Sequence, residues 1–341
     1  MLREAAPAKI NLSLHVGARR ADGYRDLESL VVFADAGDML TFERADELSL
    51  AIEGPFAGAL GASTNVPGQS PSNPQPSWPA PVPAIHRHPS RRKSYAETMD
   101  GRDTPGHDEI GAGSAEATRN NLVLRAARAL AAARGIAAKA RIVLTKNLPV
   151  ASGIGGGSAD AAATLRGLNA LWGLNASAET LRQIGLSLGS DVPVCIQSQP
   201  ARMSGRGEIV EPAPGIPALT MVLANPGISV STAEVFSRFT QTLFAFGGEG
   251  RMRGIATLGA FLEDLAQSRN DLESSAIEIA PVIAEVLAAL RGNGALLARM
   301  SGSGATCFGI FETDDGASEA AACIAQAHPD WWCVVARTAA A

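Results

Sequence analysis

The sequence lacks the marks of a disulfide-rich, zinc-binding or membrane protein. Its four cysteines are widely spaced and form no CxxC pair, so neither a disulfide framework nor a zinc site is indicated. Asn11 and His15 interrupt the N-terminal apolar stretch, which is too polar for a signal peptide. No apolar run approaches the roughly 20 residues that a membrane helix needs. We expect a cytoplasmic protein without a membrane span.

Positive charge is not in excess either. The chain has 29 lysines and arginines against 34 aspartates and glutamates, which gives a formal net charge of -5 at pH 7. Binding to the phosphate backbone of nucleic acid calls for a basic face instead. We therefore expect a small-molecule ligand, no nucleic acid or membrane partner, and a monomer or weak homodimer.

Length and periodicity predict two domains of mixed α and β structure. The 341 residues exceed the roughly 250 to 300 at which a single core stops growing. Apolar alternation and short apolar runs predict strands at 10–16, 30–34, 39–42, 48–52, 140–149, 218–226 and 331–338, and a strand pair at 298–311. The first four, separated by Gly and Asp turns, are expected to form a small antiparallel sheet. Helical spacing predicts helices at 120–135, 158–174, 177–189, 231–239, 279–292 and 316–327.

One segment has no periodicity. Residues 61–117 are dense in Pro, Ser and Gly. Such a composition cannot bury enough apolar area to offset the entropy lost on ordering, so we predict a disordered insertion there.

The stretch LPVASGIGGGSADAAA, residues 148–163, carries the strongest functional signal. Gly153 and Gly155 to Gly157 fall within five positions, and an alanine-rich helix follows. Consecutive glycines let several backbone N–H groups point at one place, and a helix N-terminus adds partial positive charge. This pattern favours a di- or triphosphate, with the Ser158 hydroxyl in reach of a phosphate oxygen or of Mg²⁺.

Three other interpretations of these glycines fit the sequence less well. A P-loop requires a lysine directly after the glycines, and none is there. A dinucleotide fingerprint matches only in part, because Ser158 occupies the third glycine site and a second helix follows where a strand is required. A purely structural turn with Ser158 as N-cap remains, but four glycines would then cost stability without return.

Three separated stretches, taken together, resemble one family. They are PAKINLSLHVGARRADGY near the N-terminus, LPVASGIGGGSADAA in the middle and MSGSGATCFGIF near the C-terminus, and in this order they resemble the GHMP kinases. The resemblance implies a two-domain α+β fold that uses ATP and Mg²⁺. Its N-terminal domain, over 1–199, would be a ribosomal-protein-S5-like β-α-β domain, and its C-terminal domain, over 200–341, ferredoxin-like.

Further stretches narrow the substrate that the resemblance implies. The DGY at 22–24, LGSDVP at 188–193 and PGISVSTAEVF at 226–236 are similar to members that phosphorylate a cytidine-diphosphate-linked methylerythritol. The implied reaction moves the ATP γ-phosphoryl group to the 2-hydroxyl of that alcohol, in the non-mevalonate route to isoprenoid precursors.

Two charged residues match the family's catalytic positions. Asp191 would accept the proton of the attacking hydroxyl, since an aspartate of ordinary pKa is ionised at neutral pH. Lys9 would keep Asp191 ionised and stabilise the charge that develops on transfer. Taken alone, Asp191 is also a common turn residue before Val-Pro, and Lys9 an ordinary strand end.

The resemblance also assigns binding residues. The ATP set is Pro149, Ala151, Ser152, Gly153, Ile154, Gly155, Gly156, Gly157, Ser158 and Ala159. The substrate set is Asn11, Tyr24, Arg25, Thr232, Phe236, Gly302 and Gly304. Tyr24 and Phe236 would stack on cytosine, although the helical spacing of Phe236 equally suits a core position. Arg25 stands where the family usually has histidine.

Two rival functions fit parts of the pattern. The first is a kinase of the same fold that acts on homoserine or a mevalonate-type alcohol. The second is a nucleotide-binding module without catalysis, which would use the glycine loop but would not need Lys9 and Asp191.

Overall fold

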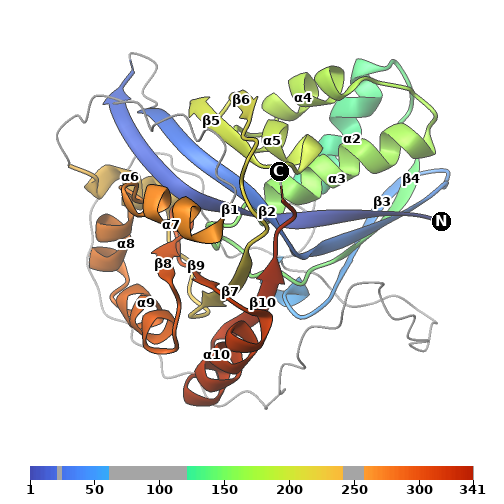
Figure 1. The fold of residues 1–341 in the computed structure, drawn as a ribbon. Helices are drawn as coiled ribbons and strands as arrows, with labels where there is room; N and C mark the ends of the chain where they lie inside the picture. Colours follow the sequence, from blue (N-terminus) through green and yellow to red (C-terminus); the bar gives the residue numbers. More distant parts are fainter. Residues whose placement is uncertain (21–24, 61–120, 241–256, 341) are drawn as a thin grey trace, which may run out of the picture.

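The computed structural model of the chain, which describes residues 1–20, 25–60, 121–240 and 257–340, contains two β-sheets (Figure 1). The first has the order β3-β4-β2-β5-β6, with β1 also paired to β2. Its strands are β1 (Leu2–Arg19), β2 (Arg25–Glu43), β3 (Leu48–Glu53), β4 (Ala140–Thr145), β5 (Ala201–Gly205) and β6 (Ile209–Pro212). The predicted insertion at 61–117 and Tyr24 lie outside the described residues.

The strand prediction was wrong in two details. Residues 30–34 and 39–42 belong to one strand, β2, instead of two strands joined by a turn. Gly37 pairs with Pro7 of β1, and a Cβ at Gly37 would lie 2.5 Å from the Ala6 carbonyl oxygen, so this glycine permits close strand approach. The segment at 48–52, expected in an antiparallel sheet, forms β3, which pairs in parallel with β4.

Four helices cover one face of the first sheet (Figure 1). They are α2 (Leu122–Ala133), α3 (Gly156–Leu171), α4 (Ala178–Leu186) and α5 (Val192–Gln197), and a short 3-10 turn, η1 (Ala57–Leu60), follows β3. Helix α2 begins at Asn121, whose side chain accepts from the Val123 amide, and it ends just before Gly135, as predicted. Helix α5 was not predicted.

The second sheet has the order β10-β7-β9-β8, and all its pairs are antiparallel. Its strands are β7 (Thr220–Asn225), β8 (Leu297–Met300), β9 (Cys307–Phe311) and β10 (Trp332–Arg337). The helices between them are α6 (Thr232–Arg238), α7 (Leu258–Ala266), α8 (Glu273–Ile279), α9 (Val282–Gly292) and α10 (Asp314–Ala327). This order of strands and helices is ferredoxin-like, which confirms the predicted α+β class.

The long helix expected through 279–292 is broken. Helix α8 ends at Ile279, and α9 begins at Val282 after Pro281. Ala280 has φ -136° and ψ 83°, because proline disfavours helical geometry in the residue before it.

The two sheets share a core. Alternate residues of β2 point to opposite faces. Val31 and Phe33 pack under the helices of the first sheet, whereas Leu30 and Val32 pack against residues of β7, β9 and α7. Strands β5 and β6 continue the first sheet to Pro212, beyond residue 199, so the division of the chain at 199/200 stays a prediction.

Asp271 joins β1 to the segment before α8, and this contact predicts an acid-sensitive stability. Its carboxylate accepts from the Val16 amide at 2.9 Å and from Arg269 Nε at 2.5 Å. Burial alone would raise the Asp271 pKa, but hydrogen bonding, first to His15, outweighs burial and holds the pKa below its usual value.

The pKa of Asp271 is lower in the folded than in the unfolded protein, where it is about 3.9. The stabilisation is therefore fully present above the unfolded pKa and is lost as the pH falls through the folded pKa. Asp271→Asn is expected to be less stable at pH 7 and to lose less stability on acidification. Urea unfolding at a series of pH values measures this. Asp330→Asn, at an exposed site, controls for the loss of one charge. Parallel pH curves for the wild type and Asp271→Asn would contradict the assignment.

Candidate active site

The glycine loop connects the end of β4 to α3. Helix α3 begins at Gly156, and Gly155 is its N-cap with a left-handed φ of 65°. Ser158 therefore lies in the first turn and is not the N-cap, so the purely structural interpretation of Ser158 was wrong. No side chain among the described residues caps α3. Its first N–H groups, with the positive end of the helix dipole, are available to an anion.

Three of the four glycines also lie close to other parts of the protein, and Gly153 is the most tightly confined. A Cβ at Gly153, where φ is 77°, would lie 2.5 Å from the Ser301 carbonyl oxygen and 2.7 Å from the Gly304 nitrogen. A Cβ at Gly155 would lie 3.1 Å from Lys9 Cβ, and one at Gly156 3.1 Å from Lys146 Nζ. Sequence reasoning assigned these glycines to phosphate alone; the structure adds close packing as a second cause.

The contact at Gly153 brings a second glycine loop, residues 301–304, against the first. The Ser301 hydroxyl donates to the Gly153 carbonyl at 3.1 Å and accepts from the Asn11 amide at 3.1 Å. Gly302 has φ 56°, and a Cβ there would lie 2.6 Å from the Gly153 oxygen. The two loops and β1 thus meet at one point.

Asn270 holds the second loop in place. Its side-chain amide donates to the carbonyls of Met300 and Gly302, both at 2.8 Å, and its Oδ1 accepts from the Leu272 amide at 3.0 Å. One buried side chain therefore holds the backbone of the second loop at positions 300 and 302.

Asn270→Ala is expected to lower the free energy of unfolding by about 1–3 kcal/mol, because buried backbone groups lose their partners. The loop should also shift, which raises the KM of the reaction. Asn293→Ala removes a single half-buried hydrogen bond, to the Ala289 carbonyl, and serves as control with a smaller loss. Equal effects of the two substitutions in urea unfolding would argue against a special role for Asn270.

Lys9 and Asp191 form the charged pair of the site. Lys9 Nζ lies 2.6 Å from Asp191 Oδ2, although the two residues are 182 positions apart. The Lys9 side chain is 5% exposed and that of Asp191 37%. The Lys9 amide donates to the Ile154 carbonyl at 2.9 Å, so the pair lies directly beside the glycine loop.

Helix α5 and Arg166 position this pair. Asp191 precedes α5, whose first turn contains Pro193. Arg166 of α3 donates to the Cys195 carbonyl at 2.9 Å and to the Ala5 carbonyl at 2.7 Å, and so ties α5 to β1. Burial raises the pKa of the Cys195 thiol to about 12, which leaves this cysteine unreactive.

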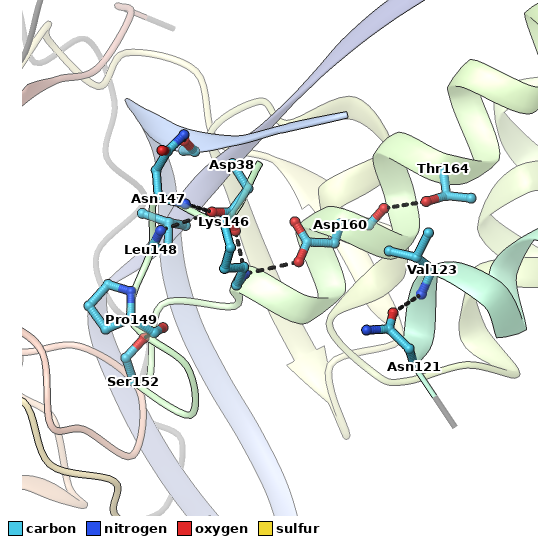
Figure 2. Close-up of polar contacts among 11 residues, drawn as sticks. Asp38, Asn121, Val123, Lys146, Asn147, Leu148, Pro149, Ser152, Asp160 and Thr164 are labelled. Carbon is cyan, nitrogen blue, oxygen red and sulfur yellow. Dashed lines mark hydrogen bonds and ion pairs between the residues drawn. The ribbon is translucent and has the colours of Figure 1, made fainter. Parts of the chain in front are cut away.

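A second charged cluster lies between the start of the loop and α3 (Figure 2). Lys146 Nζ donates to Asp38 Oδ2 and, at 2.9 Å, to Asp160 Oδ2. Burial alone would lower the Lys146 pKa, but the charges of Asp160 and Asp38 outweigh burial and raise it. Burial raises the pKa of Asp160, and the positive charge of Lys146 offsets part of that rise.

The structure places the predicted substrate residues unevenly. Asn11 is buried, its Nδ2 donates to Ser29 Oγ at 2.7 Å, and its Oδ1 has no partner within the described part of the chain. Thr232 Oγ1 lies 2.8 Å from Ser303 Oγ of the second loop. Phe236 is half-buried against the C-terminal core.

Arg25 is occupied by contacts within the protein. Its guanidinium donates to the Gly17 carbonyl at 3.4 Å and to the Phe239 carbonyl at 3.3 Å, and it lies 5.2 Å from the Phe239 ring centroid. In this structure the side chain anchors the β1–β2 hairpin to the end of α6.

Sequence reasoning missed several residues of the site, namely Asp38, Lys146, Asp160, Arg166, Asn270 and Ser301. Lys146 and Asp160 flank the glycine motif and offered a weak signal, because charged residues next to apolar runs are often solvated. Asp38 was interpreted as part of a turn. Nothing in the local sequence marks Asn270 as a partner of residue 300.

Within the described ranges, no group of three His, Cys, Asp or Glu residues is arranged to hold a metal ion. Ser158 thus stays a predicted contact for Mg²⁺. In the same residues, no helix is both long and apolar enough to span a membrane.

Known proteins resemble this chain over most of its length. The profile described as GHMP kinases N terminal domain matches residues 121–199, and the profile described as GHMP kinases C terminal matches residues 252–330. A protein of Ruegeria pomeroyi named 4-diphosphocytidyl-2-C-methyl-D-erythritol kinase is 45% identical over 337 residues, which cover 97% of each chain. A protein of Paramagnetospirillum magneticum with the same name is 43% identical over 332 residues, 96% of this chain and 95% of the other.

Solved structures extend the likeness to the fold. A crystal structure of 4-(cytidine 5'-diphospho)-2C-methyl-D-erythritol kinase matches with a TM-score of 0.67 and 27% identity over 98% of this chain and 99% of the other. A homoserine kinase from Cytophaga hutchinsonii matches with a TM-score of 0.64 over 99% of this chain and 94% of the other, but at 16% identity, which shows a shared fold alone.

Proposed function

Because this chain belongs to the 4-diphosphocytidyl-2-C-methyl-D-erythritol kinases, a family of GHMP kinases, we propose that the Lys9–Asp191 pair and the two glycine loops form its phosphotransfer site. The protein is a kinase that phosphorylates 4-(cytidine 5'-diphospho)-2-C-methyl-D-erythritol in isoprenoid precursor synthesis. The acceptor position, in our proposal, is the 2-hydroxyl, which gives the 2-phosphate and ADP.

The observation that carries the proposed site is the Lys9–Asp191 ion pair beside Gly155. Asp191 is the more exposed partner, so an incoming hydroxyl can reach its carboxylate. We propose that Asp191 accepts the hydroxyl proton as the oxygen attacks. Lys9, nearly buried and fixed by β1, donates a hydrogen bond to Asp191 and offers a positive charge to the transferring group.

The residues of the glycine loop fit a triphosphate. The first turn of α3 has no side-chain cap among the described residues, and Gly157 is exposed at its surface. ATP is the phosphoryl donor of the kinase family, and we propose that the N–H groups at the start of α3 hold its phosphates. Phosphates and water supply most ligands of a nucleotide-bound Mg²⁺, so the Ser158 hydroxyl would complete the shell.

The acceptor would lie between β1 and the second glycine loop. Asn11 has an unpartnered buried Oδ1, an acceptor for a substrate hydroxyl. Gly302 and Gly304 belong to this loop, and Thr232 contacts it through Ser303. The roles of Tyr24, Arg25 and Phe236 at cytosine, like the cytoplasmic location and the monomeric or weakly dimeric state, stay predictions.

A coupled ADP-release assay tests the function. The purified protein is given ATP with the cytidylyl substrate, with homoserine or with mevalonate. ADP release with the first acceptor only is the expected result. Release with homoserine or mevalonate in preference would establish another kinase of the same fold, and release with none would favour a binding module.

A further inference from the structure

A second set of buried charges lies outside the Lys9–Asp191 pair, and it joins three separate elements. Asp38 comes from β2, Lys146 follows β4, and Asp160 lies in α3 (Figure 2). Their side chains are 0%, 3% and 5% exposed. Lys146 and Asp38 bond to each other, to Asp160 and to the backbone at 147 and 148, so these side chains can act on a ligand through the loop that they hold.

The triad closes the glycine loop at its base. The Lys146–Asp160 ion pair at 2.9 Å links the residue before the loop to the second turn of α3, across 14 positions of sequence. Asp38 Oδ1 accepts from the amides of Asn147, at 2.6 Å, and Leu148, at 2.9 Å. Asp38 thereby fixes the start of the loop to β2. The Lys146–Asp160 pair fixes the start of the loop to α3, where the loop ends.

The triad also lies directly under the proposed phosphate site. Lys146 Nζ is 3.1 Å from the point that a Gly156 Cβ would occupy, so the ammonium lies directly against the first residue of α3. A side chain at 156 would crowd this ammonium. A shift of Lys146 would therefore move the N–H groups of the first turn of α3.

From this geometry we propose that Lys146, Asp38 and Asp160 are positioning residues, which set the shape of the glycine loop for the nucleotide without touching it. The inference rests on the proposed function of the loop. A buried ion pair is a poor source of net stability, because desolvation offsets its attraction. Here the ion pair fixes the direction of the loop backbone, which apolar packing cannot do. Its loss should lower the affinity for the nucleotide more than the affinity for the acceptor.

The test measures ADP binding by calorimetry, the KM for each substrate and the melting temperature in matched variants. Asp160→Asn keeps an acceptor for Lys146 and is expected to bind ADP like the wild type. Asp160→Leu removes the acceptor and is expected to weaken ADP binding by about tenfold to a hundredfold through misplacement of the loop, while the acceptor KM changes little. Thr164→Val, buried one turn further along α3, removes only a bond to the Asp160 carbonyl and should leave ADP binding unchanged.

In Asp160→Leu, the buried Lys146 keeps Asp38 as its carboxylate partner but loses Asp160. This loss can destabilise the folded variant. The double variant Lys146→Met/Asp160→Leu removes one pair of opposite charges, and Asp38 keeps its bonds from the Asn147 and Leu148 amides. It should fold with a lower melting temperature than the wild type and bind ADP as weakly as Asp160→Leu. A folded double variant with wild-type ADP affinity would overturn the proposal. An equal rise in the KM for ATP and in the KM for the acceptor in Asp160→Leu would also overturn the proposal. ADP binding by the wild type without turnover of any acceptor would instead count against the proposed function, and the variant comparison would still stand.

Discussion

Asp191→Ala is expected to lower kcat by about 10²–10⁴-fold, the usual contribution of a positioned general base. The nucleotide affinity should stay close to that of the wild type, because Asp191 acts on the acceptor in our proposal and its side chain bonds to Lys9, not to the glycine loop. Steady-state kinetics with the cytidylyl substrate, together with ADP binding, measures both quantities.

Stability must be followed in the same experiment. Lys9 is nearly buried and loses its partner at 2.6 Å in Asp191→Ala. Asp191→Asn is the matched control, since its amide oxygen still accepts from Lys9 but cannot take up the proton. The two variants should be similarly inactive, with Asp191→Asn the more stable. Near-wild-type turnover in Asp191→Asn would remove Asp191 from the role of base.

Gly153→Ala is expected to separate the two glycine loops. Its backbone φ of 77° strains an L-residue, at about 1–3 kcal/mol. Its Cβ would meet backbone atoms of Ser301 and Gly304 at 2.5 to 2.8 Å, and such overpacking costs about as much again, 1–3 kcal/mol. Backbone cannot move aside as a flexible side chain can, so the loops must part and activity should fall with stability.

Gly157→Ala is the control for this prediction. Gly157 is exposed, its φ is not positive, and the nearest atom to an added Cβ is Leu122 Cδ1 at 3.4 Å. Thermal unfolding should show Gly153→Ala well below the wild type and Gly157→Ala at or above it, because alanine favours a helix. Equal melting temperatures for Gly153→Ala and the wild type would contradict the close contact between the loops.

Local sequence was a sound guide to elements whose signals are local. The Asn121 cap and Gly135 bound α2 because a side chain within two residues satisfies the helix end. The glycines at 153–157 marked the loop because they stand together in the chain. The prediction failed at Asp38 and Gly37, where residues typical of turns are satisfied inside β2 by partners distant in the sequence.

By itself, the sequence determined the α+β class and, through resemblance, the kinase family, and it predicted a phosphate-binding role for the glycine loop. Only the tertiary structure decided that Lys9 meets Asp191, that Gly153 must be bare for the second loop as well, and that Lys146 is held between two buried carboxylates. The reason is physical. Caps and glycine turns depend on neighbours in the chain, whereas a buried charge or a close backbone contact depends on which remote segment the fold brings against it.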